Sequence, residues 1–127
     1  MKRSIILVLL SLCIGLTAGA QTSPRQKMIH MAAVRIAESI QVPASDREVF
    51  VTLYQNYKKE SAAIMAVRAP QTGEPDQDAE AKILGDFEKS EKLLELRKKY
   101  YGEFRKILSP TQIQKMYNAE RESAAAH

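Results

Sequence analysis

One stretch of this sequence, residues 78–108, follows a helical pattern for long enough to set the shape of the molecule. Apolar side chains recur along it at helical spacing and predict a single helix. At about 1.5 Å per residue this helix is roughly 45 Å long. Its main apolar stripe is expected to form the core face and consists of Ile83, Phe87, Leu94, Tyr101, Phe104 and Leu108.

A second apolar row lies beside this stripe and widens the apolar arc to about half the helix circumference. It consists of Leu93, Leu96, Tyr100 and Ile107. Three lysines at seven-residue spacing, Lys92, Lys99 and Lys106, line the same flank. The pattern has two interpretations: a solvated lysine row beside ordinary core, assisted by Glu88 and Glu95, or a surface that binds a partner.

A helix boundary follows the long segment. Ser109 and Gln112 have the spacing of a capping box, Pro110 occupies the first helical position, and Leu108 with Ile113 can form a hydrophobic staple. These signals predict a last helix over residues 110–122, with Ile113, Met116 and Tyr117 buried.

The first half of the chain predicts two further helices, over residues 26–40 and 46–69, separated by a break at Pro43. Ser45 and Glu48 form a second expected capping box. The first core stripe is Ile29, Ala32, Ala33, Ile36 and Ile40. The second is Phe50, Leu53, Tyr57, Ile64 and Val67, with Glu60 inside it by angle.

Residues 70–75 contain two prolines and a glycine, and predict a loop that divides the domain into two antiparallel hairpins. Asp76, Asp78 and Glu80 follow this loop and imitate the start of an EF-hand. Ala81 and Phe87 stand where that motif needs its glycine and its bidentate glutamate. We therefore interpret the three carboxylates as favouring a helix N-terminus.

The N-terminal residues 1–20 have the pattern of a signal peptide, with Lys2 and Arg3 before an apolar run and small residues at 18–20. A membrane anchor or a lipoprotein at Cys13 is the alternative, but the apolar run is shorter than the ~20 residues of a spanning helix. Cleavage leaves residues 21–127 as a single exported domain without cysteine or membrane insertion. Loss of both basic residues lowers the net charge from +4 to +2, which argues against nucleic acid.

The sequence offers no catalytic constellation, so we expect no enzyme and no cofactor. The histidines are His30 and the terminal His127, and neither has a nucleophile in an evident relation to it. His30 could combine with Met28, Met31 and Glu38 into a mixed metal site. A lone helical histidine is more often structural, so no metal site is predicted.

Two charged residues fall within apolar stripes: Arg97 in the long helix and Glu120 in the last one. If these helices fold back on each other, both residues lie at matching distances from the boundary. We therefore predict a partly buried ion pair between them that sets the register of the two helices.

The pattern Leu108, Ser109 and Gln112 after a long charged helix resembles the LTXXQ motif that names the Spy/CpxP family of periplasmic proteins. The segment 88–117 looks most like that family. A degenerate earlier copy begins at Val42, with proline and aspartate at two motif positions. In both copies an apolar residue stands eight positions after the first, at Phe50 and Met116.

This resemblance implies an elongated, curved, cradle-shaped helical homodimer in the periplasm. It implies an ATP-independent chaperone that holds unfolded client proteins, or alternatively an envelope-stress regulator that docks on a sensor kinase, or a metal sensor. For the chaperone, the flank of the long helix provides the candidate client-binding residues: Lys92, Leu93, Leu96, Lys99, Tyr100, Lys106 and Ile107.

Overall fold

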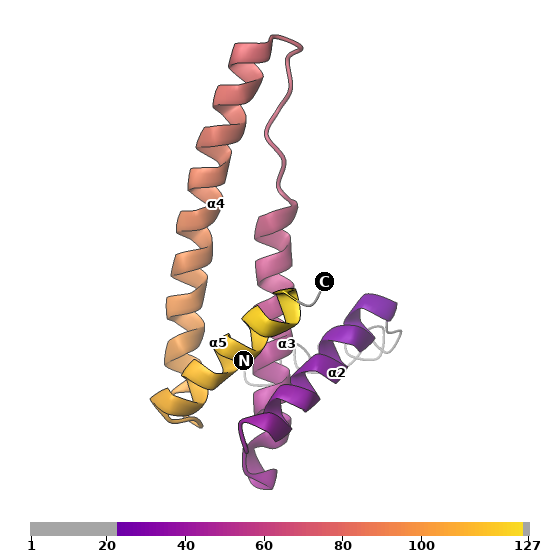
Figure 1. Ribbon diagram of the computed structural model, residues 1–127, viewed down its shortest axis with the longest axis vertical. Helices are drawn as coiled ribbons and strands as arrows, with labels where there is room; N and C mark the ends of the chain where they lie inside the picture. Colours follow the sequence, from indigo (N-terminus) through magenta and orange to yellow (C-terminus); the bar gives the residue numbers. More distant parts are fainter. Residues whose placement is uncertain (1–22, 126–127) are drawn as a thin grey trace, which may run out of the picture.

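The computed structural model describes residues 23–125 and consists of four helices (Figure 1). These are α2 (Pro24–Ser39), α3 (Ala44–Ala66), α4 (Pro75–Phe104) and α5 (Pro110–Ala125). No strand occurs in this part of the chain, which confirms the all-α prediction with four helices. The predicted signal peptide lies outside the described residues. No described helix is long and apolar enough to cross a membrane.

The helices are arranged around α3, which packs against both α2 and α4. Figure 1 shows α3 and α4 side by side as a long antiparallel pair, joined at its far end by the extended segment 67–74. The helix α2 lies against the opposite end of α3, and α5 turns back from the end of α4 to cross α3 (Figure 1). All four helices therefore meet at one end of the α3–α4 pair, which we call the base.

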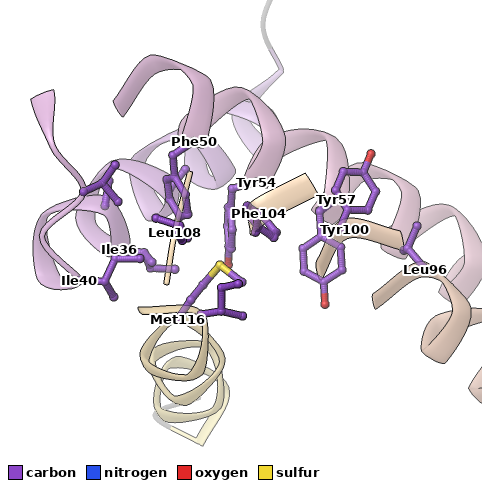
Figure 2. Close-up of a cluster of buried hydrophobic side chains, with 14 residues drawn as sticks. Ile36, Ile40, Phe50, Tyr54, Tyr57, Leu96, Tyr100, Phe104, Leu108 and Met116 are labelled. Atoms are coloured by element: carbon purple, nitrogen blue, oxygen red, sulfur yellow. The ribbon is translucent and has the colours of Figure 1, made fainter. Parts of the chain in front are cut away.

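The hydrophobic core fills this base (Figure 2). Its centre is aromatic: the Phe50 and Phe104 rings lie 5.7 Å apart between centroids, and the Tyr57 and Tyr100 rings 5.5 Å apart. Between Lys58 and Glu95, no described side chain is buried. The outer part of the α3–α4 hairpin therefore consists of two helices with no enclosed core of their own.

The structure corrects the division of the apolar arc on α4. Leu96 and Tyr100, from the predicted second row, are buried together with Phe104 and Leu108. The rest of the predicted core stripe is exposed: Ile83, Phe87, Leu94 and Tyr101. The periodicity identified both rows, but α3 approaches α4 on the side of Leu96 and Tyr100, and only that contact decides which row is enclosed.

The other stripes are closer to prediction. Ala33, Ile36 and Ile40 are buried on α2, and Phe50 and Tyr57 on α3. Tyr54 is also buried and was missed, whereas Val67 lies beyond the end of α3 and is exposed. On α5, Ile113 and Met116 are buried as predicted, and Tyr117 is half-buried.

Helix ends differ from prediction by up to four residues. α2 begins earlier than expected because Ser23 and Gln26 form a capping box, with Ser23 Oγ accepting from the Gln26 N–H at 3.2 Å. The capping box predicted at Ser45 and Glu48 is wrong. α3 starts at Ala44 after Pro43, and no side chain caps it.

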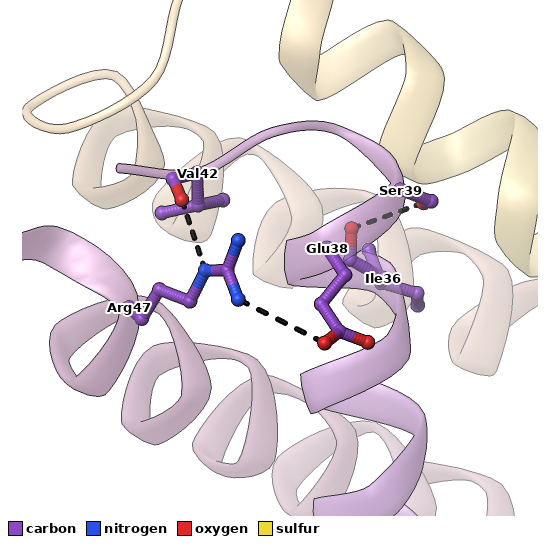
Figure 3. A network of polar contacts seen from close by, with 5 residues as sticks. All are labelled: Ile36, Glu38, Ser39, Val42 and Arg47. Carbon is purple, nitrogen blue, oxygen red and sulfur yellow. Dashed lines mark hydrogen bonds and ion pairs between the residues drawn. The ribbon is translucent and has the colours of Figure 1, made fainter. Parts of the chain in front are cut away.

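The turn between α2 and α3 is a Schellman motif with a glutamine in the position that usually holds glycine. Gln41 has a φ of 60°, and the Val42 N–H donates to the Ala37 carbonyl at 2.9 Å. Figure 3 shows Arg47 reaching this turn, where its Nε donates to the Val42 carbonyl at 3.0 Å. Arg47 also lies 3.9 Å from the Glu38 carboxylate (Figure 3). The turn is thus stabilised by the Arg47 side chain of α3 as well as by its own backbone hydrogen bonds.

The capping box at Ser109 and Gln112 is confirmed. Ser109 Oγ accepts from the Gln112 N–H at 3.2 Å, and Gln112 Oε1 accepts from the Ser109 N–H at 2.9 Å. The staple residues Leu108 and Ile113 are both buried. The nitrogen of the same side-chain amide, Gln112 Nε2, donates to the backbone carbonyl of Ile40 at 3.1 Å. The two copies of the sequence motif therefore lie next to each other at the base.

The long loop is fixed to the start of α4 by one carboxylate. Asp78 accepts from the Thr72 N–H at 2.7 Å, from the Thr72 hydroxyl at 2.9 Å and from the Gly73 N–H at 3.0 Å. These hydrogen bonds lower the pKa of Asp78, and the one from the Thr72 N–H has the largest effect. Asp76 and Asp78 thus occupy the first turn of the helix, as expected for carboxylates that favour a helix N-terminus.

Candidate functional site

The most unusual surface of the described chain is the outer α3–α4 hairpin, where large apolar side chains face solvent. Phe87 is 61% exposed and Ile83 52%. We call the exposed apolar residues of this region the hairpin surface: Met65, Val67, Ile83, Leu84, Phe87 and Leu94. Isolated exposed apolar residues are common, but a group of them in one region marks a binding surface more often than chance.

Four exposed residues of α4 are aligned along the helix, and we call them the α4 stripe: Ile83, Phe87, Leu94 and Tyr101. Spacings of four, seven and seven residues keep them on one side of the helix. The stripe runs from the outer hairpin down to the base, where the Arg97 guanidinium lies over the Tyr117 ring at 4.5 Å from its centroid. It is therefore a linear apolar surface bordered by α5 at one end.

The structure separates the predicted client-binding residues into two groups. Leu96 and Tyr100 are only 7% and 6% exposed, so neither is accessible to a partner in this fold. Leu93 and Ile107 are half-buried. The exposed apolar side chains lie instead on the α4 stripe, which the sequence had assigned to the core.

The three predicted lysines are exposed, and each lies next to a carboxylate. Lys92 is 3.0 Å from Glu88, Lys99 is 3.4 Å from Glu60, and Lys106 is 3.3 Å from Glu103. Surface ion pairs of this kind contribute little and exchange readily with solvent. The lysine row thus matches the interpretation of a solvated face, and it remains accessible to acidic groups of a partner.

Glu60 links α3 to α4 near the edge of the core. It accepts a hydrogen bond from the Tyr100 hydroxyl in addition to its contact with Lys99. The hydrogen bond from Tyr100 is the main cause that lowers the pKa of Glu60, and Lys99 adds to it. The pKa of Tyr100 is raised to about 12, mainly because the hydroxyl is buried and also because the Glu60 carboxylate lies next to it. Further out along the hairpin, the Lys89 ammonium also joins the two helices, donating to the backbone carbonyl of Met65 at 3.2 Å.

The predicted ion pair between Arg97 and Glu120 is not present among the described side chains. Glu120 instead lies 3.1 Å from Lys58 and accepts a hydrogen bond from the Tyr54 hydroxyl at 3.0 Å. The pKa of Tyr54 is raised, mainly because its hydroxyl is buried and also because the Glu120 carboxylate lies next to it. The prediction failed because it assumed that α5 folds back along α4, whereas α5 crosses towards α3 and delivers its carboxylate there.

Two open grooves of about 270 and 360 Å³ lie between α2 and α3. His30 lines the first, and its Nδ1 lies 3.3 Å from Gln55 Nε2. Glu38, from the alternative metal set, is near Arg47. Within the described part of the chain, no three His, Cys, Asp or Glu side chains lie together in a way that would hold a metal ion.

Comparisons with protein-family models, with curated proteins and with solved structures found no match for this chain.

Proposed function

We propose that this protein is an ATP-independent periplasmic chaperone that holds unfolded proteins on the hairpin surface. The observation that carries the proposal is the outer hairpin itself, which exposes six large apolar side chains and encloses none between Lys58 and Glu95. A small domain gains no stability from leaving such residues in water. Their exposure is accounted for by a partner that supplies apolar groups.

The chemistry of the hairpin surface suits partners of varied sequence. Its residues are branched aliphatic side chains with one aromatic ring, Phe87, and Met65 adds a flexible side chain that adapts to different shapes. The nearby lysines attract carboxylates only weakly, because each already has an acidic neighbour. Such binding is moderate in strength and partly sensitive to salt.

The resemblance to the Spy/CpxP family supports the same function and adds its finer elements: a curved cradle, a homodimer and a periplasmic location. The motif residues that carry the resemblance hold the base of the fold together, since Gln112 joins the two turns there. The long antiparallel pair of α3 and α4 is compatible with an elongated cradle (Figure 1). These elements belong to the proposal.

Light scattering of an aggregating client tests this function. A chemically denatured protein is diluted into buffer with and without residues 21–127, in the absence of nucleotide. We expect suppression of aggregation at near-stoichiometric ratios. The double variant Phe87→Ser and Leu94→Ser should suppress much less, because both side chains are exposed and contribute to binding but not to the core.

The matched control is Val49→Ser with Met31→Ser, which removes two exposed apolar side chains outside the hairpin surface. This control should suppress aggregation as well as the wild type does. Circular dichroism establishes that every variant is helical. A folded wild-type protein that leaves aggregation unchanged would overturn the proposal.

A further inference from the structure

The side of α2 that points away from the core combines exposed apolar side chains with cations. Met28 is 70% exposed and Met31 is 60% exposed. On an ideal helix Lys27 and Arg35 lie about 40° to either side of Met31, and both are exposed. We call these residues, with one further exposed valine, the α2 outer face: Lys27, Met28, Met31, Val34 and Arg35. Its central methionine therefore has a positive charge on each side.

The cations of this helix do not stabilise the described fold. Within residues 23–125, neither Lys27 nor Arg35 takes part in an ion pair. The first turn of α2 contains no acidic residue, and Arg25 and Lys27 lie at this end of the helix. The helix dipole disfavours positive charge there. A negatively charged partner outside the chain accounts for these charges better than the helix itself does.

The positive charge continues into the larger groove between α2 and α3. Arg25 and Lys59 both line this groove of about 360 Å³, and neither forms an ion pair with another described residue. Acidic groups near α2 lie elsewhere: Glu38 is at its C-terminal end beside Arg47, and Glu48 lines the smaller groove. Four cations thus surround the exposed methionines.

We infer that the α2 outer face docks this protein on the surface of an anionic lipid bilayer. A helix with a basic polar side and a short apolar row lies along such a surface, with its apolar side chains at the boundary between headgroups and acyl chains. The cations then contact lipid phosphates. Methionine side chains are flexible and adapt to disordered acyl chains. An acidic protein could neutralise the same cations, but a bilayer also takes up the methionines without a matching pocket.

This docking leaves the hairpin surface in water. The helix α2 packs at the base, whereas the outer α3–α4 hairpin extends away from it (Figure 1). The inference depends only on the residues of α2 and its groove, and not on the proposed chaperone function. If both hold, the surface that binds clients is kept close to a membrane without being covered by it.

Co-sedimentation of residues 21–127 with lipid vesicles tests the docking. We expect binding to vesicles of equal parts phosphatidylglycerol and phosphatidylcholine, weakening as salt is raised, and no binding to phosphatidylcholine alone. Lys27→Gln with Arg35→Gln should weaken binding by about 25-fold, because each basic side chain near an anionic surface contributes about fivefold. No binding to either vesicle, or equal binding to both, would overturn the inference.

The matched control is Arg68→Gln with Lys98→Gln. It removes the same charge from two exposed residues outside α2, which also form no ion pair among the described residues. This variant should retain most of the vesicle binding, because charges far from the contact are screened by salt. An equal loss in both double variants would show attraction by net charge alone and overturn the inference.

Tryptophan fluorescence tests which face contacts the lipid. The sequence contains no tryptophan, so a single substitution reports without background. Met31→Trp should shift its emission to shorter wavelength when anionic vesicles are added, since the side chain enters an apolar environment. Phe87→Trp, on the hairpin surface, should show no shift. The reverse pattern would show docking through the hairpin and overturn the inference.

Light scattering without lipid separates the two proposals. The Lys27→Gln and Arg35→Gln variant should suppress client aggregation as well as the wild type does, because both residues lie outside the hairpin surface. A wild-type protein that binds anionic vesicles but holds no client would contradict the chaperone function alone. One that holds client but binds no vesicle would contradict the docking alone.

Discussion

The side chain of Gln112 donates from Nε2 to the backbone carbonyl of Ile40 at 3.1 Å, across 72 residues of sequence. The same side chain accepts from the Ser109 N–H through Oε1. One amide therefore caps the start of α5 and also satisfies a carbonyl at the end of α2. This gives the motif glutamine a structural role that a local helix cap alone would not require.

Replacement of Gln112 by alanine should lower the free energy of unfolding by about 1–2 kcal/mol, because a cap and a long-range hydrogen bond are lost together. Gln112→Glu separates the two contributions. Its carboxylate can still accept from Ser109, but it cannot donate to Ile40. Urea denaturation measures both variants. A Gln112→Glu protein as stable as the wild type would show that the contact with Ile40 contributes nothing.

A double-mutant cycle distinguishes the two possible partners of Glu120. We expect a coupling free energy of about 0.5–1 kcal/mol between Glu120→Gln and Lys58→Met, since these side chains form a partly buried ion pair. The cycle of Glu120→Gln with Arg97→Met should be additive. Thermal denaturation of the six proteins gives both values. Coupling to Arg97 alone would favour the register predicted from the sequence.

The contact between Glu60 and Tyr100 should be visible in acid. Because the folded protein lowers the pKa of Glu60, this contact stabilises the fold above the ordinary value of 4.5 and is lost as the pH falls through the folded pKa. Tyr100→Phe removes the donor and should raise the pKa of Glu60 towards its ordinary value. NMR titration of the Glu60 carboxyl carbon in both proteins measures the shift. An unchanged pKa would assign the lowering to Lys99.

Gln41 occupies a left-handed backbone conformation that costs energy for residues with a Cβ atom. Gln41→Gly should relieve this strain and raise the free energy of unfolding by up to about 0.5–1 kcal/mol, after the greater flexibility of glycine in the unfolded chain is included. The β-branched variant Gln41→Val should destabilise the protein. Chemical denaturation compares all three, and a less stable glycine variant would show that the glutamine side chain itself contributes at this turn.

Charge reversal at Lys92, Lys99 and Lys106 tests how much the lysine row adds to client binding. We expect a modest decrease in client holding at low salt and little difference at high salt, because exposed charges are screened. The Phe87→Ser and Leu94→Ser variant should lose more under both conditions. A larger effect from the lysines would make charge, and not the α4 stripe, the main determinant of binding.

Local signals in the sequence determined the helices and several of their ends. Apolar periodicity located all four elements, and the Ser109 and Gln112 pair marked the start of α5 to the residue. These features depend on residues three or four positions apart, which contact one another whatever the rest of the chain does. The first residue of each motif copy and the apolar residue eight positions later are buried in the core: Val42 and Phe50, and Leu108 and Met116.

Only the tertiary structure decided how the helices face one another. On α4, two neighbouring apolar rows were equally compatible with burial, and the approach of α3 enclosed Leu96 and Tyr100 while leaving Phe87 and Leu94 in solvent. The partner of Glu120 depended likewise on the direction in which α5 leaves its turn. Periodicity predicts that a helix has an apolar face. Which part of a wide apolar face is buried depends on packing between segments that are distant in sequence.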